Sequence, residues 1–273
     1  MKDVNRLEYE NYINGLLDDY ARMTVIQNNA IFEAMMNDAV VNGYLDRNPI
    51  LKIFIGDSPI KPKDKRISLE EFQSWDACAK KILRKYDYAM VRISYFGVRR
   101  SEIMGIKFSS LKLVNGRFRI HLDESRTYRR PNGSGMKTKQ SERYVVVDEE
   151  TTELLKYVIK KSKKIAKEAG RILNKDDFLF LDSGSNIRKN IGKPIAYVRI
   201  ANLFRNVSAV NGKHVTPHMM RHFFATQGQI AGVPVEHMAA ALGHSTSYMT
   251  QKYTHIKDEV ANEVTDSFLR AIK

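Results

Sequence analysis

Cysteine is nearly absent from this sequence, and its scarcity excludes several kinds of site. The only cysteine among the 273 residues is Cys78, and no Cys-x-x-Cys pair is present. A single cysteine cannot form an internal disulfide, which excludes a disulfide framework and the motifs built on paired cysteines. We therefore expect the protein in a reducing compartment, such as the cytoplasm.

Long hydrophobic runs are absent as well. No apolar run approaches the ~18–20 residues that cross a bilayer, and the charged amino terminus lacks the apolar centre of a secretory signal. The sequence also has no internal repeat and no low-complexity tract. With 43% hydrophobic residues the composition is that of a globular protein, and the length suggests about two domains. We therefore predict no membrane partner.

Acidic residues are too few to balance the basic ones. The net charge is +14, which favours a polyanionic partner but also suits a solvated surface. The charge is unevenly distributed, because residues 1–57 hold five basic against nine acidic side chains, a balance of −4. Residues 58–273 therefore carry a balance of +18, so the basic character belongs to the later part of the chain.

The first part of the chain has a helical pattern. Apolar residues recur near helical spacing through residues 5–43, which predicts two helices, and Gly43 then interrupts the pattern. A bundle this small buries little surface alone. Residues 58–68 follow with two prolines and four basic side chains. They read either as a solvated linker or as a strap across a phosphate backbone.

Residues 69–147 combine helices with a small sheet. Ser68 and Glu71 have the spacing of a capping box, which predicts a helix through about residue 83. Alternation in residues 117–122 and 142–147 predicts two antiparallel strands joined by a loop rich in Pro, Gly and Ser. Strands and loop carry eight basic side chains: Arg117, Arg119, Arg126, Arg129, Arg130, Lys137, Lys139 and Arg143.

Helical periodicity covers much of the remaining chain. Helices are predicted at residues 87–95, 150–170, 195–210 and 258–273, with another from residue 101. The last of these helices has an apolar stripe formed by Val260, Val264, Phe268 and Ile272. A stripe of this kind must be buried, either against its own chain or against a neighbour.

Residues 216–255 hold most of the candidate chemistry. Thr216 suits a helix cap and Pro217 a first helical position. His218 and Arg221 would then share one face of that helix, since residues three apart are neighbours. Two histidines, an arginine and a tyrosine in one block suggest phosphate chemistry.

Further side chains complete a constellation suited to phosphodiester transfer. A second helix ends just before His244, and Tyr253 follows nine residues later. Arg99 stands at the mouth of another helix, and Lys137 lies in the hairpin loop. Such a transfer needs an in-line nucleophile, cations on the nonbridging oxygens and an acid for the leaving oxygen.

Each requirement has a candidate residue. The phenol of Tyr253 can attack phosphorus once it loses its proton, while Arg99 and Arg221 can clamp the phosphate with donors that stay protonated. His244 can hydrogen-bond a third oxygen, and His218 is a plausible proton acceptor or relay. The loop lysine is a candidate acid for the departing 5′ oxygen. Because no acidic cluster suggests a divalent metal, the guanidinium groups would replace one.

The chain resembles the tyrosine recombinases of the phage-integrase family. The matching residues are Arg99 with Glu102, Lys137-Thr138, His218-Met219-Met220-Arg221, Leu242-Gly243-His244 and Tyr253. The interval of 23 residues from Arg221 to His244 and the nine onward to Tyr253 are also the family's. The resemblance covers residues 69–273, and all six expected active-site positions are filled.

The resemblance implies a mixed α/β fold, mostly helical, with a small antiparallel sheet. It implies a catalytic domain at residues 69–273, ending in a C-terminal helix at residues 258–273. A partial helical core-binding domain of the SAM-like kind would occupy residues 1–57, with a basic linker at residues 58–68. Integrases of this kind usually have an additional arm-binding domain, so we expect a truncated or naturally short member.

The resemblance also implies an activity and partners. The activity is site-specific DNA recombination, as in integration by a phage or mobile element, through a 3′-phosphotyrosyl intermediate with neither metal nor ATP. The implied partners are double-stranded DNA, further copies that form a tetramer on DNA through the C-terminal helix, and an accessory excisionase or host DNA-bending protein. A type IB topoisomerase and a DNA-binding module without catalysis are the competing functions. The full set of active-site positions disfavours the second of these.

Several positions have alternative interpretations. Tyr248 is the nearest competitor of Tyr253 as nucleophile. His218 and His222 have a spacing that can bind zinc on a helix, but a third ligand and the usual glutamate are missing. We therefore predict His222 to be a buried, hydrogen-bonded structural residue that supports the site. Glu102 is predicted to brace active-site side chains.

Basic residues outside the catalytic set are predicted to bind DNA. Arg100 could replace Arg99 as the phosphate clamp, but the family pattern favours Arg99, which leaves Arg100 to solvent or the DNA backbone. The predicted DNA-binding residues are Lys61, Lys63, Lys65, Arg66, Arg100, Arg126, Arg129, Arg130 and Lys139.

Overall fold

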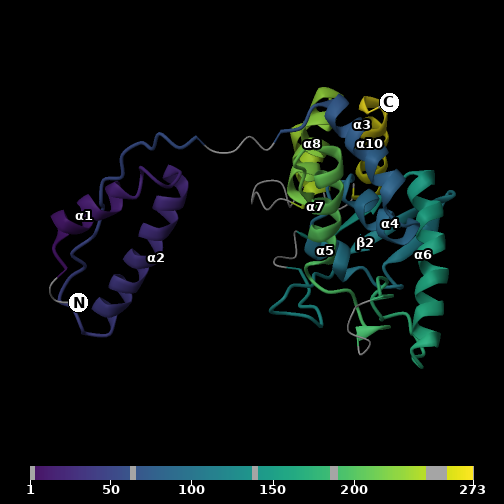
Figure 1. Cartoon of the computed structure of the whole chain (residues 1–273), viewed down its shortest axis with the longest axis horizontal. Coiled ribbons are helices and arrows are strands. Elements are labelled where there is room, and N and C mark those ends of the chain that lie inside the picture. The colour runs from purple at the N-terminus through teal and green to yellow at the C-terminus, as the bar shows by residue number, and fades with distance from the viewer. Residues whose placement is uncertain (1–3, 62–65, 137–140, 185–189, 244–256, 273) are drawn as a thin grey trace. The chain divides into compact units, whose positions relative to one another are not determined.

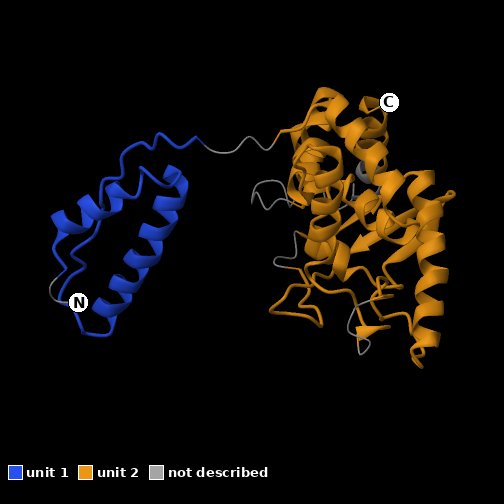
Figure 2. Ribbon diagram, viewed as in Figure 1, with its two compact units in different colours: residues 1–64 blue, residues 65–273 orange. Residues whose placement is uncertain are grey.

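A computed structural model of the chain forms two compact units, Met1–Asp64 (unit 1) and Lys65–Lys273 (unit 2) (Figure 2). It describes residues 4–61, 66–136, 141–184, 190–243 and 257–272. The elements are α1 (Arg6–Gly15), α2 (Arg22–Val41), α3 (Leu69–Ile82), α4 (Lys85–Ser94), α5 (Arg100–Gly105), β1 (Leu111–Val114), β2 (Arg117–Leu122), β3 (Arg143–Val146), α6 (Glu149–Glu168), α7 (Arg199–Asn211), α8 (Pro217–Ile230), α9 (Val235–Leu242) and α10 (Lys257–Ala271) (Figure 1). This confirms the predicted class, mixed α/β and mostly helical with a small antiparallel sheet. No helix in these described ranges combines the length and apolar character needed to cross a membrane.

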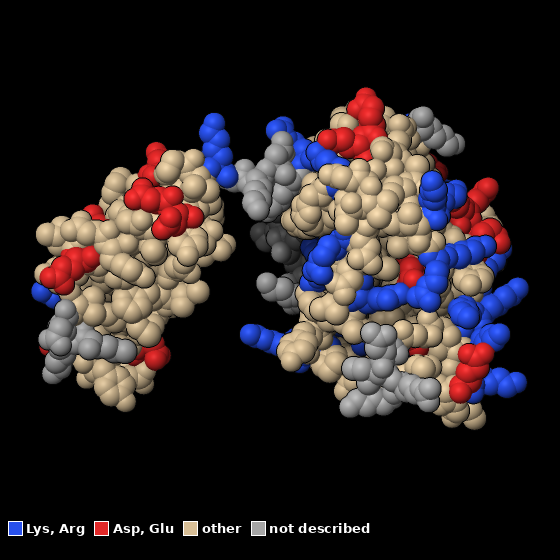
Figure 3. Space-filling view, viewed as in Figure 1, with Lys and Arg blue, Asp and Glu red and all other residues tan. Residues whose placement is uncertain are grey.

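Unit 1 contains the two predicted helices, α1 and α2. Its small core is formed by Ile13, Leu17 and Val25, and several large apolar side chains elsewhere on the unit are exposed. The hydroxyl of Ser58 lies 2.8 Å from the carbonyl oxygens of Leu17 and Tyr20. Ser58, which the sequence places in the linker, is therefore fastened to unit 1. Figure 3 shows few basic groups on the viewed face of this unit.

The core of unit 2 surrounds α4, whose residues from Tyr86 to Ser94 are all buried. Helix α6 packs along α4, and α3 packs against α7. Trp75 of α3 is fully buried, stacks on Phe204 with ring centroids 5.0 Å apart, and donates its indole N–H to the Ser208 hydroxyl at 3.2 Å. A buried indole needs such a partner, so this contact fixes the packing of α3 on α7.

The sheet of unit 2 is antiparallel in the order β1-β2-β3. Ile120 of β2 pairs with Val145 of β3, and the side chains of both are buried. The two strands predicted from alternation are β2 and β3. Strand β1 was not predicted as a separate strand, because it is mostly exposed and lacks a buried apolar face.

Helix ends follow local sequence signals in most places. Ser68 and Glu71 form the predicted capping box, and the Thr216 side chain accepts the Met219 N–H at 3.2 Å at the start of α8. Helix α7 begins at Arg199, four residues later than predicted. The preceding Ile195 donates its N–H to the carbonyl of Phe180 at 3.1 Å, so that segment pairs with another strand-like segment before the helix begins.

The C-terminal helix α10 packs on its own chain. It contacts β3, α8 and α9, and the side chains of Val264 and Phe268 are buried there. Phe268 lies 4.9 Å from the ring of Phe224, and Thr265 donates to the carbonyl of Val146 at 2.8 Å. Val264 and Phe268 of the apolar stripe are thus covered within the same unit, and packing of this helix on a neighbouring copy stays a prediction.

Removing the Phe268 side chain should destabilise unit 2. Phe268→Ala leaves a cavity in a fully buried site, so we expect the free energy of unfolding to fall by about 3–5 kcal/mol. Chemical denaturation of the full chain measures this change. The control is Glu263→Ala, since that side chain of α10 is half-exposed and pairs with His237 near the surface. Equal stability of the two variants would show that α10 does not depend on this contact.

Candidate active site

A cavity of about 430 Å³ opens in unit 2. It is lined by Arg99, Arg100, Ser101, Thr127, Tyr197, Thr216, Pro217, His218 and Arg221. These residues come from the start of α5, the loop after β2, the segment before α7 and the start of α8. The described lining carries three arginines and no Asp or Glu, so the cavity is suited to an anion.

A buried carboxylate holds Arg99 in place. Glu102 accepts the Arg99 backbone N–H at 2.8 Å and an Arg99 guanidinium N–H at 2.7 Å. The same carboxylate accepts two N–H groups of Arg143, at 2.8 and 3.1 Å. Glu102 therefore lies between two guanidinium groups, and Arg99, whose side chain is 37% exposed, is the one that reaches the cavity.

Arg143 is a buried residue of this site. Its place in the sequence puts it among the basic residues of the hairpin, but it is 4% exposed and also donates to the carbonyl of Ala241 at 2.7 Å. It faces inward because it shares one side of β3 with Val145. Strand alternation could have identified this orientation from the sequence. An arginine on the apolar side of a strand requires a buried acceptor, which Glu102 supplies.

The pKa of Glu102 reflects these partners. Burial alone would raise it, but the charge and hydrogen bonds of Arg143, together with the hydrogen bonds of Arg99, lower the pKa of Glu102 to about 2. Glu102 is therefore ionised at neutral pH. It can orient arginines, but it cannot serve as a general base near pH 7, since it binds a proton too weakly.

Arg221 is held deep in the cavity by backbone carbonyls. Its guanidinium donates to the carbonyl of Gly97 at 2.6 Å and to the carbonyl of Leu242, and the residue is 6% exposed. Burial, with the charges of Arg99 and Arg143, lowers the pKa of Arg221 to about 9. Arg221 remains charged at neutral pH, and a bound anion would stabilise that charge.

Gly97 is required where Arg221 meets the start of α5. Its φ is +72°, and a Cβ at this position would lie 2.7 Å from Phe224 and 2.8 Å from Leu242. Only glycine fits this close approach and left-handed conformation. The turn that results points the carbonyl of Gly97 at Arg221.

His218 and His222 contact each other at the edge of the cavity. Their Nε2 atoms are 3.0 Å apart, and the rings meet edge to face. The prediction that His222 is buried is wrong: the residue is exposed, because its position on α8 points away from the core. It is hydrogen-bonded as predicted, to His218. The described residues contain no group of three His, Cys, Asp or Glu side chains able to hold a metal ion.

Arg126 lies inside the fold. It is 5% exposed and donates to the carbonyls of Pro131, Met104 and Ile195, with its guanidinium over the ring of Phe178. Its prediction as a DNA-binding residue is therefore wrong, because these carbonyls occupy the guanidinium inside the fold. The other described members of that set are at least partly exposed: Lys61, Arg66, Arg100, Arg129 and Arg130.

Several predicted site residues lie outside the described residues. They are Lys63, Lys65, Lys137, Lys139, His244, Tyr248 and Tyr253. The last described residue before His244 lies at the site, because the Arg99 guanidinium donates to the carbonyl of Gly243 at 3.5 Å. The structure thus brings together Arg99, Glu102, His218 and Arg221, which are up to 122 residues apart in the sequence.

Known proteins resemble the chain in sequence. The XerD tyrosine recombinase of Chlorobaculum tepidum is 29% identical over 67% of this chain and 52% of its own length. A tyrosine recombinase of Pseudothermotoga lettingae is 25% identical over 99% of this chain and 84% of its own length. The chain spans about half the length of several of the curated relatives it matches, including the XerD protein.

Solved structures share the fold. The Tn1549 transposon integrase, in complex with transposon right end DNA, superposes with a TM-score of 0.67 at 20% identity, over 97% of this chain and 86% of that one. The XerH site-specific recombinase, bound to a palindromic difH substrate, gives a TM-score of 0.65 at 16% identity, over 97% and 70% of the two chains. The phage integrase family model matches residues 67–260, which include every residue proposed for the active site. The chain therefore belongs to the phage integrase family.

Proposed function

We propose that the chain is a site-specific DNA recombinase that cleaves and rejoins strands through a 3′-phosphotyrosyl intermediate. The observation that carries this proposal is the cavity in which Arg99 and Arg221 are held by buried partners beside His218. Two guanidinium groups and an imidazole are the donors that a phosphodiester in transfer needs. Membership of the phage integrase family supports the same chemistry.

The proposed reaction exchanges one ester oxygen for another. The hydroxyl oxygen of Tyr253 attacks phosphorus, and a new P–O bond forms as the bond to the 5′ oxygen breaks. The phenolic proton passes to His218, and Lys137 gives a proton to the departing 5′ oxygen. A 5′ hydroxyl from another strand then reverses these steps and releases the tyrosine.

The cations of the cavity would act mainly on the transition state. Negative charge accumulates on the nonbridging oxygens as the attacking oxygen approaches, and donors fixed in advance stabilise it without reorganisation. Arg99 is fixed by Glu102, and Arg221 by the carbonyls of Gly97 and Leu242. The lowered pKa of Arg221, caused by burial and nearby arginines, indicates a charge that a phosphate would compensate.

We propose that this exchange needs neither metal nor ATP. A phosphodiester bond of DNA is replaced by a phosphotyrosyl ester bond, so the energy of the broken bond is conserved in the intermediate. The guanidinium groups would supply the positive charge that metal ions supply elsewhere.

Strand exchange between two duplexes needs several active sites at once. We therefore propose a tetramer on double-stranded DNA, with an excisionase or a host DNA-bending protein as accessory partner. Donation of α10 within such an assembly would first require its removal from β3, α8 and α9, which exposes Phe268. Assembly through α10 is thus coupled to partial opening of unit 2.

Covalent capture tests the proposal. The probe is a library of duplexes with a randomised central sequence and one nick, because the short fragment released beside the nick diffuses away and prevents rejoining. We expect the full chain to form an adduct that survives denaturing electrophoresis, and sequencing of the attached strand identifies the cleavage site. Salt-sensitive binding without any adduct would instead support a binding module. Adducts at unrelated sequences, with relaxation of supercoils, would support a topoisomerase.

A further inference from the structure

The geometry points to a second phosphate subsite in the cavity, where Arg100, positioned by Tyr197, binds the phosphodiester next to the scissile one on the same strand. This inference rests on the proposed DNA substrate. It assigns to Tyr197 a role that no sequence motif indicated, and it gives Arg100 a defined target.

Two consecutive arginines are held in different directions at the start of α5. The Arg99 guanidinium is fixed by Glu102 and lies near the carbonyl of Gly243. The Arg100 guanidinium lies over the ring of Tyr197, with its central carbon 4.0 Å from the ring centroid, and donates a hydrogen bond to the Tyr197 hydroxyl. Arg99 and Arg100 therefore present positive charge at two separate places in one cavity.

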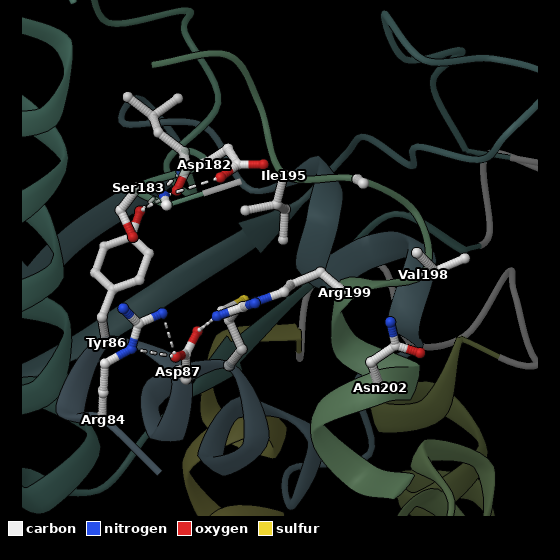
Figure 4. A pocket seen from close by; sticks show the side chains of 13 residues that line it. Arg84, Tyr86, Asp87, Asp182, Ser183, Ile195, Val198, Arg199 and Asn202 are labelled. Carbon is white, nitrogen blue, oxygen red and sulfur yellow. Dashed lines mark hydrogen bonds and ion pairs between the residues drawn. The ribbon is translucent and has the colours of Figure 1, made fainter. Parts of the chain in front are cut away.

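The chain on either side of Tyr197 is held at two points. On one side, the buried Ile195 donates its N–H to the carbonyl of Phe180. On the other, Arg199 forms an ion pair with Asp87 at 2.6 Å, and Figure 4 shows Asp87 between Arg199 and Arg84. Asp87 is itself buried, so this anchor is rigid. Tyr197 is thus a preformed platform for Arg100.

A stacked guanidinium is well suited to a phosphate. The ring face attracts the cation, and the N–H groups at the edge of the guanidinium stay directed sideways, where they can meet nonbridging oxygens. Stacking also reduces the rotamer entropy that an arginine loses on binding. The described lining of the cavity offers no carboxylate to compete for this charge.

The spacing of DNA phosphates identifies the ligand. Along one strand a phosphate recurs about every 3.4 Å of helix axis, so a groove that accepts the scissile phosphate also meets its neighbour. Arg99, Arg221 and His218 provide enough donors for the scissile phosphate. The Arg100 guanidinium, held over the Tyr197 ring, is placed for the next one.

Replacing single charged phosphates of the DNA by uncharged methylphosphonates tests the inference. The probe is a duplex selected for tight binding to the full chain from a randomised library, with a single methylphosphonate moved stepwise along each strand. Equilibrium binding is measured at each position, so the result does not depend on cleavage. For the unaltered chain we expect two adjacent positions on one strand at which loss of charge weakens binding, by about tenfold each.

Protein variants assign these two positions. Arg100→Gln should weaken binding to the unmodified duplex about tenfold and become insensitive to the methylphosphonate at one of the two positions only. Tyr197→Leu should weaken binding about three- to tenfold and reduce sensitivity at that same position, whereas Tyr197→Phe, which keeps the ring, should have the smaller effect. Thermal melting of each variant separates these effects from loss of fold.

Arg205→Gln is the matched control, since Arg205 of α7 is an exposed arginine outside both the cavity lining and the predicted DNA-binding set. It should keep full sensitivity at both positions. The inference is overturned if Arg100→Gln retains the pattern of the unaltered chain, or if its lost position is not adjacent to the other. If two adjacent phosphates are sensitive to methylphosphonate but covalent capture gives no adduct, the subsite is supported and the proposed cleavage is rejected.

Discussion

Tyr253→Phe should abolish covalent attachment to DNA, lowering adduct formation by more than about 10³-fold, while Tyr248→Phe retains it. The phenolic oxygen is the proposed nucleophile, and phenylalanine removes that atom with little change in volume. Denaturing electrophoresis with the captured duplex measures the adduct. DNA binding by Tyr253→Phe should stay within about threefold of the unaltered chain, because the arginines of the cavity are intact.

The comparison of the two tyrosines makes this prediction specific. Both lie in the segment after Gly243, and both are phenols that a general loss of the segment would affect together. Loss of adducts in Tyr248→Phe, with their retention in Tyr253→Phe, would exchange the two assignments. Equal adduct formation by both variants would place the nucleophile elsewhere.

Glu102→Gln should lower the free energy of unfolding by about 3–5 kcal/mol, because it leaves Arg143 buried without a charged partner. Glutamine has nearly the same shape but can accept only through one oxygen. The melting temperature should fall by roughly 6–20 °C, which calorimetry of the full chain measures. Adduct formation should fall as well, since Arg99 loses the group that orients it.

The pH dependence of this effect has a defined sign. Burial raises the pKa of Glu102, but the charge and hydrogen bonds of Arg143 and the hydrogen bonds of Arg99 outweigh it. The pKa is lowered to about 2 in the folded chain. A lowered carboxylate pKa gives stability that is present above the unfolded value of about 4.3 and is lost as pH falls toward 2. The difference between Glu102→Gln and the unaltered chain should therefore be largest above about pH 5 and shrink between pH 4.3 and 2.

An exposed carboxylate serves as the control. Glu153 of α6 pairs with Lys156 at the surface, and its side chain is 66% exposed. Glu153→Gln should leave the melting temperature and adduct formation unchanged. If Glu102→Gln melts like this control at neutral pH, Glu102 does not hold the two arginines as the structure indicates.

Local signals in the sequence were sufficient to place the elements that carry the site. The capping box at Ser68 and the Thr216-Pro217 start of α8 depend on neighbouring residues alone, so their spacing identifies them. The helical face shared by His218 and Arg221 follows from that start. The assembly of Arg99 with Arg221 was expected from the needs of phosphodiester transfer and from the family resemblance rather than from local spacing, because they meet by tertiary packing.

Burial of basic side chains was the main feature that sequence reasoning missed. Arg126 and Arg143 lie in a hairpin with many exposed basic residues, and the residue type arginine does not indicate burial. In the structure backbone carbonyls surround Arg126, and Glu102 pairs with Arg143. Net charge counts every arginine alike, but desolvation and pairing decide which ones reach DNA. Tyr197 was missed for a related reason: its contact with Arg100 joins segments 97 residues apart.

The sequence also could not show which surface covers the apolar stripe of the C-terminal helix. Periodicity showed that Val264 and Phe268 must be buried, but a stripe fits its own chain or a neighbour equally well. In this structure the surface formed by β3, α8 and α9 covers both side chains, which periodicity alone could not show.

The most direct test of the account is to map the DNA-linked residue by mass spectrometry of an adduct formed in EDTA. Trypsin cuts after Arg221, Lys252 and Lys257, so Tyr253 falls in the peptide of residues 253–257 and Tyr248 in that of residues 222–252. The account predicts a nucleotide joined through its 3′ phosphate to Tyr253, with a free 5′ hydroxyl on the released strand. Attachment to another residue, or an adduct that forms only when a divalent metal is supplied, would contradict it.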